Sequence, residues 1–117
     1  MKLVIINGPN LNLLGKREPE VYGTASFDDW YHVLVAQYPN IDFEYFQSNV
    51  EGELINELQR VGFTATGIIF NPGGYTHTSV AIGDAVSAIT TPVVEVHISN
   101  VHAREDFRKI SHVSAKA

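Results

Sequence analysis

Cysteine is absent from the 117-residue chain, which excludes disulfide bonds and thiolate metal sites. No window approaches the ~20 consecutive apolar residues that a membrane-spanning helix requires, and an apolar strand pattern follows Met1-Lys2 without a signal peptide. The motifs GxGxxG and GxxxxGK(S/T) do not occur, so no motif supports dinucleotide or P-loop nucleotide binding. These absences predict a cytoplasmic protein that contacts no membrane.

Basic residues are scarce, because eight Lys and Arg stand against 13 Asp and Glu and give a net charge of −5. This balance argues against a nucleic-acid partner. Five of the eight cations lie in only two segments: Lys16, Arg17, Arg104, Arg108 and Lys109. In an acidic protein this clustering indicates local sites for a small anion, although two solvated charged faces would give the same pattern.

Histidine shows no metal-binding pattern. The five histidines lack an HExxH context, and His97 and His102 stand five residues apart across a predicted strand end, which is not a ligand spacing. We therefore expect no metal site.

Length and hydrophobicity predict one globular domain, residues 1–117, with a single core. Strand and helix patterns alternate along the chain, with strands expected at 3–6, 41–46, 67–70 and 93–96. Helices are expected at 26–37, 51–61, 79–88 and 102–109, the first opened by a cap at Ser26 and the third by Thr78 or Ser79. In the third helix we expect Val80, Ala81 and Ala85 to face the core.

This alternation predicts an α/β fold, a parallel sheet with helices on both faces. In such folds ligands bind beyond the carboxyl ends of the strands. Three polar segments follow predicted strands directly, at residues 7–22, 71–77 and 97–100. The sequence therefore predicts a site where these segments converge on one edge of the sheet.

Four motifs together resemble type II 3-dehydroquinate dehydratase: NGPNLNLLGKREPEVYG, QSNVEGELI, NPGGYTHTS and EVHISNVHAREDFR. The resemblance implies a flavodoxin-like three-layer sandwich with strand order 2-1-3-4-5, assembled as a homododecamer of four trimers. It implies a lyase of the shikimate pathway that dehydrates 3-dehydroquinate to 3-dehydroshikimate by anti elimination through an enolate. It also implies no metal and no cofactor. Aromatic biosynthesis and quinate breakdown both remain open as its setting.

The resemblance also implies catalytic roles. Tyr22 matches the base that removes the C2 proton, Arg17 the cation that makes this phenol more acidic, and Asn10 the residue that holds a water near the enolate oxygen. His97 matches the acid that protonates the departing C1 hydroxyl, with Glu95 supporting it.

Further residues match substrate contacts. Asn71 and His77 would bind substrate hydroxyls, the backbone amides of Ile98 and Ser99 the carboxylate, Arg108 a ring hydroxyl, and Asp84 would approach from a neighbouring subunit.

These residue types suit the reaction. A phenol titrates near ~10, so a base of this kind needs a nearby guanidinium to favour its charged form. Histidine titrates closest to neutral and suits an acid for a leaving hydroxide. Taken one at a time, Tyr22 is more often a packed loop aromatic and His97 a structural histidine, and it is the family resemblance that outweighs these interpretations. The alternative functions are a catalytically silent module that binds a small carboxylate and, less well supported, a flavin or phosphate domain.

The chain departs from the family pattern at Gly83, at Val50, which replaces a frequent histidine of the second motif, and at its end. Gly83 stands where the family usually has arginine, and a glycine inside a helix costs ~1 kcal/mol relative to alanine. The family continues beyond the position of Ala117 with one more strand and a long helix, so we expect this chain to be an incomplete form of the domain.

Overall fold

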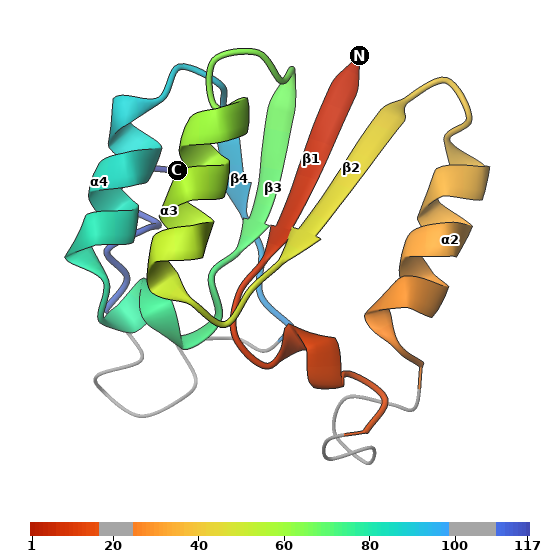
Figure 1. Ribbon diagram of the computed structural model, residues 1–117, viewed down its shortest axis with the longest axis horizontal. Coiled ribbons are helices and arrows are strands. Elements are labelled where there is room, and N and C mark those ends of the chain that lie inside the picture. The colour runs from red at the N-terminus through yellow and green to blue at the C-terminus, as the bar shows by residue number, and fades with distance from the viewer. Residues whose placement is uncertain (17–24, 99–109) are drawn as a thin grey trace.

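The four strands form one parallel sheet in the order β2-β1-β3-β4 (Figure 1). The computed structural model describes residues 1–16, 25–98 and 110–117. The strands are β1 (Lys2–Asn7), β2 (Asp42–Gln47), β3 (Gly67–Asn71) and β4 (Val93–Glu95). Each lies within one residue of its predicted bounds, and the parallel α/β prediction is confirmed.

Three α-helices connect the strands: α2 (Phe27–Gln37), α3 (Glu51–Val61) and α4 (Val80–Ala88). Two short 3₁₀ helices, η1 (Leu11–Leu13) and η2 (Gly73–His77), follow β1 and β3. Ser26 caps α2 in a capping box with Asp29, and Ser79, rather than Thr78, caps α4. The helix expected at 102–109 lies outside the described residues.

One face of the sheet is covered by α3 and α4, and the main core lies beneath them (Figure 1). Alternate residues of a strand point to opposite faces, so Val4 and Ile6 of β1 and Ile68 and Phe70 of β3 enter this core. The amphipathic helix α3 adds Leu54, Leu58 and Val61 to the same core.

The prediction for the buried face of α4 was wrong for two of its three residues. Val80 is 57% exposed and Ala81 is also exposed, whereas Ala85 is buried as expected. The core-facing stripe is Ile82, Ala85 and Val86, which continues to Ile89 just beyond the helix. Spacings of three and four residues place these side chains on one helix face.

The segment 110–117 packs against α4 and brings the C-terminus beside it (Figure 1). Its anchor is Val113, which is fully buried in the core, and the His112 amide donates to the Thr76 carbonyl at 2.8 Å. Gly83 is buried at this contact: a β-carbon there would lie 2.6 Å from the His112 carbonyl oxygen. The glycine therefore has a packing reason in this chain.

Among the described residues, α2 is the helix that covers the opposite face of the sheet. This helix has no buried residue, and it contacts the sheet through aromatic stacking of Phe27 and Tyr31 on Tyr45. On β4, Val94 faces this side and is 60% exposed. The space between α2 and the sheet is the cavity that the functional-site residues border.

Candidate functional site

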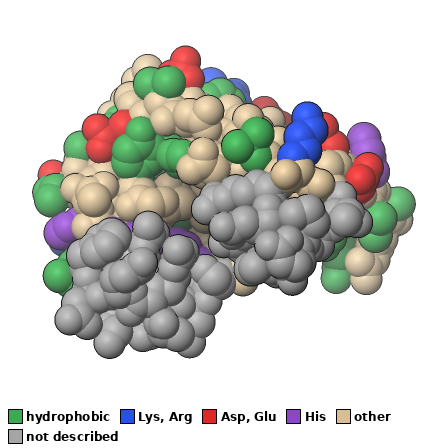
Figure 2. All heavy atoms as spheres, turned by 90° about the horizontal axis from the view of Figure 1, so that it is seen from below, with side chains coloured by type: hydrophobic (Ala, Val, Ile, Leu, Met, Phe, Trp, Pro, Cys, Tyr) green, Lys and Arg blue, Asp and Glu red, His purple; other side chains and the backbone are tan. Residues whose placement is uncertain are grey.

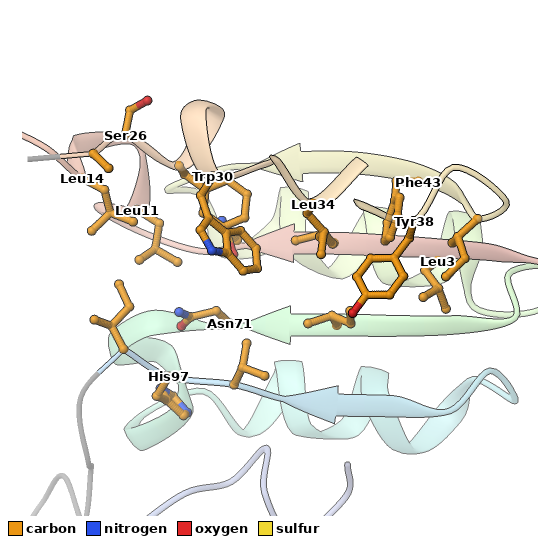
Figure 3. Close-up of a pocket in the computed structure, with 18 residues that line it drawn as sticks. Leu3, Leu11, Leu14, Ser26, Trp30, Leu34, Tyr38, Phe43, Asn71 and His97 are labelled. Atoms are coloured by element: carbon orange, nitrogen blue, oxygen red, sulfur yellow. The ribbon is translucent and has the colours of Figure 1, made fainter. Parts of the chain in front are cut away.

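The carboxyl ends of three strands meet at one end of a cavity of about 620 Å³ (Figure 3). Asn7 ends β1 and Asn71 ends β3, at paired positions of the sheet. His97 follows β4 by two residues, and all three side chains line the cavity together with Ile98. Because parallel strands end at the same edge, residues far apart in sequence converge here.

The cavity is polar at this end and apolar along its length. Asn71 and His97 lie near Leu11 and Leu14 of the first loop, whereas Leu34 of α2 lies farther along (Figure 3). The remaining wall is mainly aliphatic and aromatic: Leu3, Ile5, Phe27, Trp30, Tyr38, Ile41, Phe43, Ile69 and Val96. A small polar ligand would therefore be held at the strand ends, where the hydrogen-bonding groups are.

His97 is paired with Glu95. The Nε2 atom of His97 lies 2.5 Å from Oε1 of Glu95, and the side chains are 19% and 6% exposed. A carboxylate can only accept hydrogen bonds, so Nε2 carries a proton. The pairing fixes the orientation of the imidazole ring and leaves Nδ1 for other contacts.

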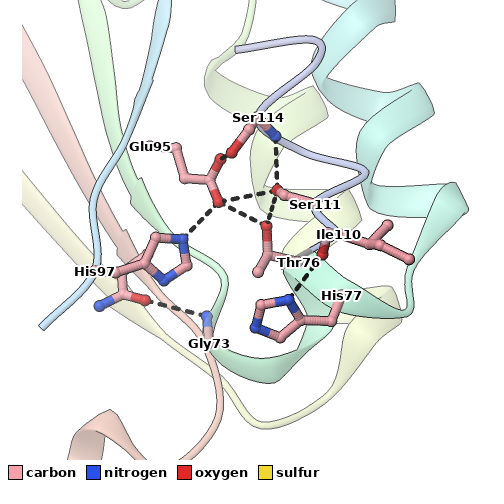
Figure 4. Close-up of polar contacts among 9 residues, drawn as sticks. Gly73, Thr76, His77, Glu95, His97, Ile110, Ser111 and Ser114 are labelled. Carbon is pink, nitrogen blue, oxygen red and sulfur yellow. Dashed lines mark hydrogen bonds and ion pairs between the residues drawn. The ribbon is translucent and has the colours of Figure 1, made fainter. Parts of the chain in front are cut away.

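Glu95 is ionised despite its burial. Burial alone would raise the pKa of this carboxyl, but hydrogen bonds from His97, Ser114 and Thr76 and the charge of His97 lower the pKa to about 2. The hydroxyl of Thr76 donates to Oε1 at 2.6 Å, and that of Ser114 donates to Oε2 (Figure 4). The ionised carboxylate is therefore a charged acceptor for the Nε2 proton of His97.

His77 and Asn71 are both buried beside the loop that follows β3. The Nδ1 atom of His77 lies 2.8 Å from the Ile110 carbonyl and therefore donates to it. The Asn71 Oδ1 accepts the Gly73 amide at 3.1 Å, so its amide nitrogen is the end that can donate to a ligand. His77 is not part of the cavity wall.

Asn10 lies in the first loop in a left-handed conformation, with φ of 70°. Its backbone amide donates to Oδ1 of Asn49 at 3.1 Å, and Gln47 donates to the same oxygen at 3.2 Å. Asparagine tolerates this conformation better than most residues do. The contact ties the first loop to the segment after β2, but the Asn10 side chain does not line the cavity.

The remaining predicted residues fall into two groups. Asp84 is exposed on α4, on the other side of the sheet from α2, and is not among the residues that line the cavity. Four predicted positions lie outside the described residues: Arg17, Tyr22, Ser99 and Arg108.

Sequence reasoning assigned no role to four residues that the structure brings to the site: Asn7, Thr76, Ser111 and Ser114. Asn7 could have been found from its position at the end of β1, equivalent to that of Asn71. The three hydroxyl residues carried no such signal, since serine and threonine are common in turns and caps.

Figure 2 views the molecule from below, the end at which the strands terminate, and some histidine side chains are visible in this view. Within residues 1–16, 25–98 and 110–117, no group of three or more His, Cys, Asp or Glu could hold a metal ion. None of the helices in these ranges is long and apolar enough to cross a membrane.

A parallel flavodoxin-like sheet with a carboxylate–histidine pair at its carboxyl edge defines an α/β protein equipped for proton transfer. The family model described as dehydroquinase class II matches residues 1–117. The chain therefore belongs to the class II dehydroquinase family.

Individual relatives agree with this assignment. A 3-dehydroquinate dehydratase from Fusobacterium nucleatum is 58% identical over 116 residues, which cover 94% of this chain and 78% of the relative. 3-Dehydroquinate dehydratase 1 from Agrobacterium fabrum is 52% identical over 117 residues, covering 98% and 81% of the two chains. The crystal structure of type II dehydroquinase from Butyrivibrio crossotus superposes with a TM-score of 0.91 at 44% identity, covering 98% of this chain and 82% of that one.

Proposed function

We propose that this protein is a hydro-lyase that dehydrates 3-dehydroquinate to 3-dehydroshikimate. The observation that carries the proposal is the His97–Glu95 pair at the polar end of the cavity, in a chain whose family match runs from residue 1 to 117. The curated relatives at about 50% identity bear the name of this activity.

The reaction begins with removal of the C2 proton, next to the C3 ketone, by Tyr22 as base. The electron pair of the C–H bond forms an enolate, whose oxygen needs donors directed at it; we assign a water held by Asn10 to this role. We assign to Arg17 the role of favouring the phenolate of Tyr22, because a nearby cation lowers the pKa of a phenol.

The enolate then reforms the ketone and expels the C1 hydroxyl, which takes a proton from His97 and leaves as water. Since Nε2 of His97 is held by Glu95, the proton comes from Nδ1. The products are an enone and one water, so the atoms balance without a cofactor.

The substrate contacts complete the proposal. Asn71 would donate its amide nitrogen to a ring hydroxyl, and His77 and Arg108 would contact further hydroxyls. The backbone amides of Ile98 and Ser99 would hold the carboxylate, and Asp84 would approach from a neighbouring subunit. We further propose a cytoplasmic homododecamer, a tetramer of trimers, which light scattering would test.

Turnover is tested by mixing the purified protein with 3-dehydroquinate and following the absorbance of the conjugated enone. Tyr22→Phe removes one hydroxyl and should reduce kcat by about 10²- to 10⁴-fold, the usual range for acid–base catalysis. His97→Ala should slow the loss of water but keep exchange of the C2 proton with solvent deuterium. Binding of 3-dehydroquinate with no turnover would instead favour the silent carboxylate-binding module.

A further inference from the structure

Glu95 receives hydrogen bonds from three separate parts of the fold (Figure 4). His97 follows β4, Thr76 lies in η2 and Ser114 lies in the C-terminal segment, whose Ser111 hydroxyl comes within 3.4 Å of Oε1. Two carboxylate oxygens offer about four acceptor positions. Three of these positions are filled at short range: Oε1 is shared by His97 and the Thr76 hydroxyl, and Oε2 is bound by Ser114.

The direction of these hydrogen bonds follows from the charge of Glu95. An ionised carboxylate has no proton to give, so Thr76 must use its single hydroxyl proton on Oε1, at 2.6 Å. The Thr76 and Ser111 hydroxyls lie 2.5 Å apart, so Ser111 is the donor in that contact. Its single proton is then directed to Thr76 rather than to Oε1 of Glu95, which is 3.4 Å away. Ser111 in turn accepts the Ser114 amide at 3.0 Å. The donors form a one-way relay that ends on Glu95.

Thr76 is the member of this relay that water cannot replace. Its side chain is fully buried, with 0% exposure, whereas Ser111 is half-buried and Ser114 is exposed. Hydrogen bonds in a buried network strengthen one another, and a buried polar group that loses its partner destabilises the network. Loss of the Thr76 hydroxyl should therefore disturb the hydrogen bonding of Glu95 more than loss of either serine hydroxyl would.

We propose that Thr76 and Ser111 are positioning residues for His97, acting through Glu95 by holding its Oε1 against Nε2 of the imidazole. With the ring held in this way, Nδ1 remains the nitrogen that meets a ligand in the cavity. Neither residue needs to touch the substrate. The inference rests on the proposed function only for its kinetic readout.

The decisive comparison is between Thr76→Val and Thr76→Ser. Valine keeps the volume and removes the hydroxyl, while serine keeps the hydroxyl and removes a methyl group. We expect Thr76→Val to lower kcat for 3-dehydroquinate by about 10- to 100-fold, the equivalent of one hydrogen bond to a charged group. KM should stay near the wild-type value, and Thr76→Ser should recover most of the rate. Thr78→Val, the same change at an exposed position of the same motif, should behave as wild type.

A second readout does not depend on turnover. The side-chain ¹⁵N and ¹H resonances of His97 report the proton on Nε2 and its hydrogen bond. These resonances should move in Thr76→Val and stay in place in Thr76→Ser and Thr78→Val. If the wild-type protein shows no turnover, the proposed function fails, while this spectroscopic comparison still tests the positioning role.

Several results would overturn the inference. One is a Thr76→Val protein with wild-type kcat and unchanged His97 resonances. Another is an equal loss in the valine and serine variants, which would point to packing rather than to the hydroxyl. Should Thr76→Val fail to fold, Ser111→Ala removes the previous donor of the relay and should lower kcat by about 2- to 10-fold. Unchanged kcat and resonances in Ser111→Ala would then count against the proposal.

Discussion

The backbone of Gly83 in α4 packs against the carbonyl oxygen of His112, so closely that a β-carbon at position 83 would lie 2.6 Å from that oxygen. The contact matters for the site because His112 stands between Ser111, which contacts the Thr76 hydroxyl, and Ser114, which binds Glu95. A helix on one face of the sheet thus holds the segment that supports the acid–base pair.

Gly83→Ala should destabilise the protein, although alanine is the better helix former. The gain in helix propensity is ~1 kcal/mol, whereas forcing a methyl group into a packed contact costs about 1–3 kcal/mol. We expect a net loss of about 1 kcal/mol in urea unfolding. Gly52→Ala is the matched control, because a β-carbon at Gly52 in α3 would meet nothing within 4 Å, and it should stabilise the protein. Equal stabilisation by both changes would contradict the close contact at His112.

Ser26→Ala should weaken α2. The Ser26 hydroxyl accepts the Asp29 amide at 3.1 Å, and the Asp29 carboxylate accepts the Ser26 amide at 3.2 Å. Loss of an N-cap of this kind costs about 0.5–2 kcal/mol, and α2 has no buried residue to compensate. Hydrogen exchange of α2 amides should be faster in the variant. Ser87→Ala, at an exposed position inside α4, should leave that exchange unchanged.

Glu95 should make stability depend on pH in the acid range. Its pKa in the folded protein is about 2, against an ordinary value of 4.5. As the pH falls, Glu95 of the unfolded chain therefore binds a proton before Glu95 of the folded protein does. The stabilisation that the ionised Glu95 gives to the fold is complete above pH 4.5 and is lost as the pH falls towards 2. The loss amounts to at most about 3 kcal/mol. In urea unfolding measured across this range, Glu95→Gln should flatten the pH dependence; a variant with the wild-type slope would contradict the assignment.

Glu95→Gln should also affect catalysis. Glutamine keeps the shape of the side chain but replaces the charged acceptor of the His97 Nε2 proton with a neutral amide. We expect kcat to fall by about 10²-fold or more, as for other acid–base groups, with little change in KM. Glu51→Gln, in the first turn of α3 and away from the cavity wall, is the control. Wild-type turnover in Glu95→Gln would remove Glu95 from the support of the acid.

Prolonged chelation should leave the dehydratase rate unchanged. The side chains assigned above supply the base, the acid and the hydrogen-bond donors for the enolate, and the proposed elimination uses no metal ion. The measurement is the enone assay before and after dialysis against a chelator. A loss of rate that zinc or magnesium restores would reject this mechanism.

Much of the fold was predictable because its signals are local. The helix α3 occupies residues 51–61, as its apolar spacing predicts. The capping box at Ser26 involves only Ser26 and Asp29, so it can be recognised from a short stretch of sequence. The position of each strand end follows from the same patterns, and a parallel sheet then brings Asn71 and His97 to one edge. A run of apolar residues at a helical or strand period needs no distant partner to be recognised.

The tertiary structure alone decided which groups meet around Glu95. Thr76 and Ser111 lie 19 and 16 residues away from it along the chain. Thr76 lies in a segment predicted to border the site, but nothing in the sequence indicates that its hydroxyl, or that of Ser111, is directed towards Glu95. The buried face of α4 was mispredicted for the same reason, since the core side of a short apolar helix is set by what packs on it. From the sequence, Gly83 is expected to weaken its helix, whereas in the fold it allows the helix to pack closely against His112. Local periodicity acts over about four residues, whereas the direction of a hydroxyl towards a carboxylate depends on how three separate segments pack together.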